Sequence, residues 1–162
     1  MAVFLQRVSG PESALDSHTH LITQAYNNIQ VISALTFTEV LKVTLNIPDK
    51  CTSSSAPVDQ WNVLVIASGY LNNHTSAYSG AYLALAMDNE IPDPTFAGTS
   101  IFALLPDGGT NLPFSIHWLY TDVGSGAHDF RLMAMKTSIP SADYTARSTR
   151  LTAQAMGYEC AS

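Results

Sequence analysis

The sequence predicts an all-β protein, an antiparallel β-sandwich of jelly-roll type with a short N-terminal arm or helix. From Leu35 onward, apolar and polar residues alternate with a period of two, which is the pattern of half-buried strands. Clusters of Pro, Gly, Ser and Asp interrupt this alternation at short intervals, as turns do. No helical period follows residue 35. Because parallel strands need long crossover connections, the sheets should be antiparallel.

Residues 1–34 form the first of two predicted regions, an attachment arm or short helix. Apolar residues between Glu12 and Ser33 recur mostly at intervals of three, four and seven, which is a ragged helical period. Ser9 or Ser13 would cap such a helix. Few of these residues are charged, so we expect the arm to lie on another surface. Its anchoring residues would be Phe4, Leu5, Leu15, Leu21, Ile22 and Ile29.

Residues 35–162 form the second region, the sandwich domain. Its first strand is expected from Leu35 to Ile47. The segment 61–67 is almost continuously apolar and suits a buried central strand. The glycine-containing segment 122–127 is expected to be a hairpin loop. The other expected strands are 81–87, 99–105, 114–121, 128–136 and 147–156.

The two cysteines, Cys51 and Cys160, are too few for a disulfide framework. Free thiols are the simpler interpretation, and a bridge between them stays open because spacing alone does not decide it. An immunoglobulin-like sandwich is the second choice of architecture. Its core disulfide would need these cysteines closer in the sequence and on facing strands.

Composition excludes two classes of partner. Charged residues are 12% of the chain, against roughly 25% in typical domains, while 17 Ser and 15 Thr give a neutral, hydroxyl-rich surface. The 80 residues from Cys51 to Phe130 hold seven acids and no Lys or Arg. Nucleic acids and anionic membranes both require cations, so neither is an expected partner. We also expect no membrane insertion and synthesis in the cytoplasm, since no long apolar run or secretory signal is recognised.

Two segments offer metal-ligating side chains. Asp16, His18 and His20 could converge on a strand, but on a helix the two imidazoles would point about 200° apart. The acidic segment 88–93 offers the oxygen ligands that calcium prefers, without the spacing of an EF-hand. We interpret both as polar surface and predict no metal site and no cofactor.

His117, Asp122 and His128 lie close together in the sequence and could suggest acid–base chemistry. No nucleophile occurs in a recognisable catalytic setting, because the chain has no Gly-x-Ser-x-Gly elbow and no His-Glu-x-x-His motif. We therefore predict no catalytic residues and a protein that is not an enzyme.

Two expected strands present mildly apolar rows on the side away from the core. Val40 and Thr44 lie on the first strand, and Met133 and Met135 lie on the penultimate one. Such rows suit a subunit interface, although the core against a second sheet would use the same residues. Tyr70 and Tyr78 flank a polar loop that contains His74, and these three residues are the best candidate contact for a glycan or another partner.

Two stretches carry a resemblance to known proteins. Phe114 to Ala134 is an alternating strand, a glycine loop and then Gly126-x-His128-x-Phe130-x-Leu132-x-Ala134, and later comes Ala146-Arg147-Ser148-Thr149-Arg150-Leu151-Thr152-Ala153. This combination resembles the jelly-roll modules on the exterior of tailed-phage virions. These include capsid decoration proteins, head fibres and tail-fibre tips with a fold similar to the tumour-necrosis-factor/C1q group. The resemblance covers roughly Trp61 to Gly157.

The resemblance implies a homotrimer on the virion exterior, attached by residues 1–34 to a major capsid or tail protein, with no catalytic residues. The chain has no Gly-x-y repeat and no heptads, so a small decoration or head-fibre protein fits better than a full-length tail fibre. Two alternatives stay open: a tail-fibre tip that binds a host surface glycan, and a cupin-type enzyme, which would need converging metal ligands.

Overall fold

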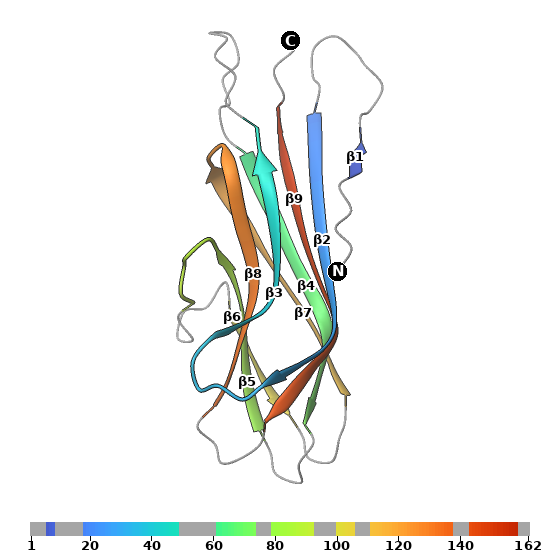
Figure 1. Ribbon diagram of the computed structural model, residues 1–162, viewed down its shortest axis with the longest axis vertical. Coiled ribbons are helices and arrows are strands. Elements are labelled where there is room, and N and C mark those ends of the chain that lie inside the picture. Colours follow the sequence, from blue (N-terminus) through green and yellow to red (C-terminus); the bar gives the residue numbers. More distant parts are fainter. Residues whose placement is uncertain are drawn as a thin grey trace.

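The computed structural model describes residues 6–8, 18–48, 61–73, 79–92, 100–105, 111–137 and 143–158. All regular structure within these ranges is β-strand, arranged in two antiparallel sheets that pack against each other (Figure 1). The predicted all-β antiparallel sandwich is therefore confirmed. The described part of the chain contains no helix that could cross a membrane.

The described residues form nine strands. Their bounds are β1 Gln6–Val8, β2 His18–Ile32, β3 Thr38–Ile47, β4 Trp61–Asn73, β5 Ser79–Met87, β6 Ser100–Leu105, β7 Asn111–Val123, β8 Gly126–Lys136 and β9 Tyr144–Tyr158. One sheet has the order β1-β2-β9-β4-β7 and the other has the order β3-β8-β5-β6. All seven strands expected from residue 35 onward are present, and β4, β7 and β9 extend furthest beyond their predicted ends.

The strands from β2 to β9 pair in a nested order. The hairpin β5·β6 is the innermost pair, followed outward in sequence by β4·β7, β3·β8 and β2·β9. Each pair is antiparallel. The chain therefore forms a two-stranded ribbon in which β2 to β5 make one strand and β6 to β9 make the returning strand. The pairs fall alternately in the two sheets, and as a result the paired ribbon wraps around one core.

The core lies between the two sheets and follows from the alternation in the sequence. On β3, Val43, Leu45 and Ile47 are buried, whereas Thr44 and Asn46 between them are exposed. Removing one such aliphatic side chain from water stabilises the fold by about 1.5–3 kcal/mol. The opposite sheet supplies core residues in the same way, notably Val63, Val65 and Ala67 of β4 and Leu151, Ala153 and Ala155 of β9.

The predicted N-terminal helix is wrong. His18–Ile32 is strand β2, paired with β9 from His18 opposite Tyr158 to Ile32 opposite Tyr144. The apolar spacing imitated a helix because the buried side of this strand changes along its length. Ala25 and Ile32, seven residues apart, are both buried. The sandwich therefore includes β2, and the predicted boundary at residues 34 and 35 falls in the connection between β2 and β3.

A β-bulge on β9 causes this change of side. Ser148 adopts the left-handed conformation, with φ of 48°, and β9 has one more residue than β4 at this point. Before the bulge the even-numbered Tyr144 and Ala146 are buried, and after it the odd-numbered Thr149 and Leu151 are buried. Bulges increase local twist and redirect side chains, and the neighbouring β2 follows β9 through the change.

The predicted hairpin at 122–127 is also wrong. The segment joins β7 to β8, and these two strands belong to different sheets, so it crosses from one layer of the sandwich to the other. Two residues beside this short connection have positive φ, Asp122 at 59° and Gly126 at 119°. Gly126 suits its position because side chains rarely allow that conformation.

Two buried tyrosines provide a matched test of the core. The Tyr144 hydroxyl donates to the Met135 carbonyl oxygen at 2.8 Å, whereas the Tyr120 hydroxyl has no partner among the described residues. Burial raises the pKa of both phenols above the ordinary value, so both stay neutral. We expect Tyr144→Phe to lower the free energy of unfolding by about 1 kcal/mol, because the carbonyl loses its donor.

Tyr120→Phe is the control, since it removes a hydroxyl that makes no bond, and we expect it to leave the free energy of unfolding unchanged or slightly raised. Urea denaturation of both variants measures the difference. Equal losses of stability in the two variants would contradict the assignment of these hydroxyls.

Candidate functional site

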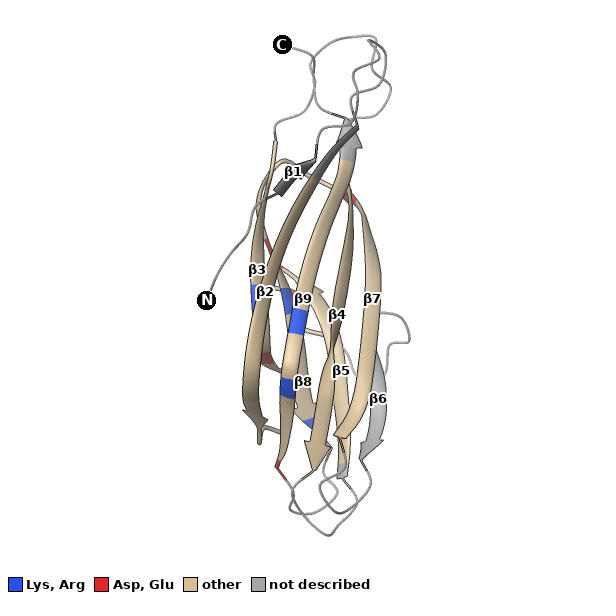
Figure 2. Cartoon of the chain, turned by 90° about the vertical axis from the view of Figure 1, so that its right-hand side faces the viewer, with Lys and Arg blue, Asp and Glu red and all other residues tan. Residues whose placement is uncertain are grey.

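The outer face of the five-stranded sheet differs in charge from the rest of the surface. Figure 2 shows this sheet from outside, with two basic positions on β9, which are Arg147 and Arg150. No Asp or Glu occurs in β2, β4 or β9, and β7 has only Asp122 near its end. The strands β2, β4 and β9 therefore contribute two guanidinium groups and no carboxylate to this sheet.

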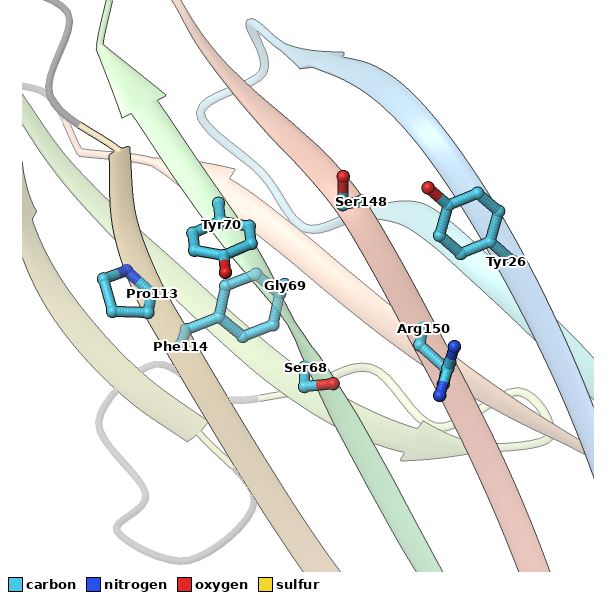
Figure 3. Close-up of a pocket in the computed structure, with 8 residues that line it drawn as sticks. All are labelled: Tyr26, Ser68, Gly69, Tyr70, Pro113, Phe114, Ser148 and Arg150. Carbon is cyan, nitrogen blue, oxygen red and sulfur yellow. The ribbon is translucent and has the colours of Figure 1, made fainter.

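A hollow of about 380 Å³ lies on this face between two tyrosines. Tyr26 of β2 and Tyr70 of β4 stand on either side of β9, as Figure 3 shows, and about half of each side chain is exposed, 52% and 46% respectively. Ser68 and Ser148 lie between the rings, and Arg150 lines the same hollow. The hollow thus combines two aromatic rings, hydroxyl groups and a cation.

The residues at the bulge are small, and the outer surface of the sheet is therefore depressed at this point. Ser148 and Thr149 of β9 stand opposite the single residue Gly69 of β4. A Cβ atom added at Gly69 would lie 3.0 Å from the Arg147 carbonyl oxygen and 3.0 Å from Cε1 of Phe114. Glycine is therefore needed here because it leaves room for the Phe114 ring, which is paired with it across the strands.

A second hollow, of about 260 Å³, adjoins the first and shares Tyr70 and Ser148 with it. Arg147 and Asn111 complete its lining. The Asn111 side-chain oxygen accepts a hydrogen bond from Asn72 Nδ2 at 2.9 Å. We call the two hollows together the tyrosine groove. Its polar and aromatic residues are Tyr26, Ser68, Tyr70, Asn111, Arg147, Ser148 and Arg150.

An exposed apolar patch lies at the β7 edge of the same sheet. Ile66, Trp118 and Leu119 have exposed fractions of 39%, 37% and 46%. Leu119 pairs with Leu64 of β4 and lies on the outer face with Ile66, whereas Trp118 pairs with the buried Val65 and therefore lies on the opposite side of β7. β7 is the outermost strand of this sheet. We call Ile66, Trp118 and Leu119 the β7 patch.

The predicted subunit interface is wrong for two of its four residues. Val40 is only 5% exposed, because it is the extra residue at an irregularity of β3 and turns into the core. Met133 is 8% exposed and packs with Ala84 and Ala86 beneath Phe37, which precedes β3. Thr44 is exposed and Met135 is half-buried. The side of the four-stranded sheet where Met133 lies is therefore partly covered by the chain itself.

Of the predicted anchoring residues, Leu21 and Ile22 are half-buried in β2 and Ile29 is exposed at 58%. Val31, which the prediction did not include, is exposed on the same strand at 56%. The remaining predicted anchors Phe4, Leu5 and Leu15 lie outside the described residues, as do His74, Tyr78, Cys51 and Cys160.

Tyr70 is the predicted contact residue that the structure places in a hollow. Sequence reasoning missed Tyr26, because that residue was assigned to a helix. It also missed Arg147 and Arg150, because the bulge that brings them beside Tyr70 and Tyr26 has no clear signal in the sequence.

A polar cluster holds the turn after β5 against β8. His128 Nδ1 lies 2.9 Å from Asp88 Oδ2, and His128 Nε2 lies 3.1 Å from the Gly124 carbonyl oxygen. Asp88 Oδ1 accepts the Asp129 amide at 2.9 Å. The carboxylate partner of His128 is therefore Asp88, forty residues away in the sequence, and not the nearby Asp122. The geometry supports a structural role, and no group of metal-ligating side chains occurs among the described residues.

No family model matches the chain, and no curated protein matches it. The function must therefore be argued from the residues of the two sheet faces.

Asp129 supplies a test of the electrostatics on the four-stranded sheet. Its carboxylate accepts from Thr44 Oγ1 at 2.6 Å and from Lys42 Nζ at 3.0 Å, and these bonds lower its pKa. They stabilise the fold above the pKa of the unfolded chain, and this contribution is lost as the pH falls through the lower pKa of the folded protein. We expect Thr44→Val to raise the pKa of Asp129 towards its ordinary value, as measured by carboxyl ¹³C NMR titration.

Thr38→Val is the matched control for this titration. Thr38 lies on the same strand, but its hydroxyl donates to the Ala134 carbonyl oxygen rather than to a carboxylate. The pKa of Asp129 should not move in this variant. A Thr44→Val protein with the wild-type pKa would show that the hydroxyl does not hold the carboxylate.

Proposed function

We propose that this protein is a non-enzymatic structural component on the exterior of a tailed-phage virion, a homotrimer of jelly-roll subunits that binds a major capsid or tail protein. The observation that carries the proposal is the nested pairing of β2 to β9 in two facing sheets. A wrapped ribbon of eight antiparallel strands is the architecture of jelly rolls, which viral capsid domains use.

The residues that resemble phage exterior modules occupy central positions in this arrangement. Phe130, Leu132 and Ala134 of β8 are fully buried, and β8 lies between β3 and β5. Leu151 and Ala153 are buried on β9, which lies between β2 and β4. The resemblance thus concerns the strands at the centre of each sheet, and this supports a shared architecture more than a shared binding site.

The β7 patch supports assembly with further copies of the chain. Three large apolar side chains at a sheet edge are unfavourable in water, and their burial would stabilise an interface. The low content of charged residues agrees with a surface that is partly covered by protein. We therefore propose that the subunits contact each other through the β7 patch and not through the four-stranded sheet.

The oligomeric state tests this assignment. We expect native mass spectrometry to give three times the 17.4 kDa of the chain. Leu119→Lys should reduce the assembly to single chains, because a charge at the edge of a sheet opposes association. Asn46→Lys, at an exposed position of β3, is the control and should leave the trimer intact. A wild-type protein that stays a single chain would refute the trimer.

Attachment to the particle is assigned to the residues before β2. Deletion of residues 1–34 would remove β2 and all its pairing with β9, so loss of binding would reflect unfolding. Deletion of residues 1–17 leaves β2 in place. We expect the wild-type chain to appear among the proteins of virions produced from the genome that encodes it, as detected by mass spectrometry, and the shortened chain to be absent from them. Virions without the wild-type chain would refute the proposal.

The alternative function is a receptor-binding module of a tail-fibre tip that binds a host surface glycan. The specific observation in its favour is the tyrosine groove, where Tyr26 and Tyr70 are exposed beside serine hydroxyls. Aromatic rings of this kind present an apolar face and a polar tip to a ligand. A cupin-type enzyme finds no comparable support, because no cluster of metal ligands occurs in the described ranges.

A further inference from the structure

We propose that the tyrosine groove binds a saccharide that carries a carboxylate, such as a uronic acid or a sialic acid. Tyr26 and Tyr70 would stack on the sugar rings, and Arg150 would bind the carboxylate. The inference rests on the alternative function above, glycan binding, and adds the class of sugar and the residues that recognise it.

The two tyrosines supply surfaces on which sugar rings can stack. They flank the hollow from β2 and β4, with β9 between them (Figure 3). The Tyr26 hydroxyl donates to Asn28 Oδ1 at 2.7 Å, so the ring is held in place before a ligand arrives. A tyrosine loses little conformational entropy on binding because it has only two side-chain torsions.

The charge of the groove selects an anionic ligand. Arg150 lines the hollow with Tyr26, and Arg147 lines the adjoining one with Tyr70, where its Nε donates to Thr145 Oγ1 at 3.3 Å. Neither β2, β4 nor β9 contains an acid, so no described strand beside Arg150 offers it a carboxylate. A guanidinium binds a carboxylate through two parallel hydrogen bonds, which is stronger and more specific than contact with a neutral hydroxyl.

Polar groups between the rings match the hydroxyls of a sugar. Ser68 and Ser148 line the first hollow, and each hydroxyl can donate and accept a hydrogen bond. Asn72 binds the side-chain oxygen of Asn111, and this orients the Asn111 amide so that its NH₂ group is the part left for a ligand. The larger hollow, of about 380 Å³, lies near the lower end of the roughly 300–1,000 Å³ range of small-molecule sites.

A saccharide fits the groove better than an acidic peptide does. An extended peptide binds most readily at a sheet edge, where backbone groups are unpaired. The groove reaches the edge strand β7 through Asn111 and Pro113, but its two tyrosines flank β9, which already pairs with β2 on one side and β4 on the other. A ligand there must bind through rings and side chains, which suits a sugar.

The part of the groove formed by β2 and β9 remains open when the β7 patch is covered, although Asn111, Pro113 and Phe114 of the lining belong to β7. Ile66 and Tyr70 are four residues apart on β4, which corresponds to roughly 13 Å along a strand. Tyr26 and Arg150 lie on β2 and β9, away from the β7 edge. Assembly through the patch and sugar binding in the groove therefore use separate parts of one sheet.

Isothermal titration of the full-length protein tests the inference with four probes: 3′-sialyllactose, digalacturonic acid, neutral lactose and oligoglutamate. We expect at least one acidic saccharide to bind and lactose to bind more weakly. Arg150→Gln and Tyr70→Ala should each weaken the acidic saccharide by about tenfold or more, since a bond to a charged group or a stacked ring is lost. Arg131→Gln, on the other sheet, is the control and should have no effect.

Three results would overturn the inference, and they separate it from the function on which it rests. Lactose that binds as tightly as the acidic sugars and ignores Arg150→Gln would leave glycan binding in place but reject the carboxylate. Tight binding of oligoglutamate that is lost in Arg150→Gln would indicate a peptide site. An absence of binding by every saccharide, in a folded wild-type protein, would reject both the inference and the glycan-binding function.

Discussion

The structure depends on the pairing of β9 with β2 on one side and with β4 on the other. β9 is the last strand of the described chain, yet it occupies the centre of the five-stranded sheet. The sheet is therefore completed only when the C-terminal strand inserts between two strands that are distant from it in sequence. Because these contacts are long-range, this step closes large loops of chain before the pairing energy is gained.

The same strand determines the shape of the outer face. The bulge at Ser148 changes which side chains of β9 and β2 point inward, and it places small residues opposite Gly69. Without the bulge, a continuous row of side chains would cover this part of the sheet. Core packing and the formation of the groove are thus two consequences of one backbone irregularity.

Much of the fold follows from the sequence because alternation and turns are local signals. The core positions Leu41, Val43, Leu45 and Ile47 could be read from period-two alternation alone, and the structure buries all four. β2 could not be predicted in this way, since the buried side of a strand changes where its neighbour has a bulge. The prediction that Val40 faces outward was wrong for a similar reason. An extra residue in β3 turns the Val40 side chain into the core.

The candidate site was less predictable than the fold. Tyr70 stood out in the sequence as an aromatic residue near a polar loop, but its neighbours in the groove come from β2, β7 and β9. Tyr26 is more than forty residues away from Tyr70 in the chain. Their proximity depends on strand order, which local sequence patterns do not encode.

The two sheets differ in how their cations are paired with carboxylates, and this difference favours a binding function for the five-stranded sheet. On the four-stranded sheet Lys42 binds Asp129, and beside it Lys136 binds Asp143, so these cations have partners within the chain. The outer face of the five-stranded sheet has arginines without carboxylates beside them on β2, β4 or β9. Arg147 donates to Thr145 Oγ1 within β9, and Arg150 is the arginine on this face that we propose binds the carboxylate of a ligand.

The β7 edge explains why assembly and stability should be linked. An edge strand exposes unpaired backbone groups. Natural proteins commonly protect such edges with lysine and other charged residues, or with proline. β7 has no Lys or Arg, and between Pro113 and Asp122 it has no charged residue at all apart from the titratable His117. Trp118 and Leu119 lie within this uncharged stretch. An edge that is both uncharged and apolar favours uncontrolled association of a single chain. In an oligomer another subunit covers this edge, and its burial stabilises the assembly.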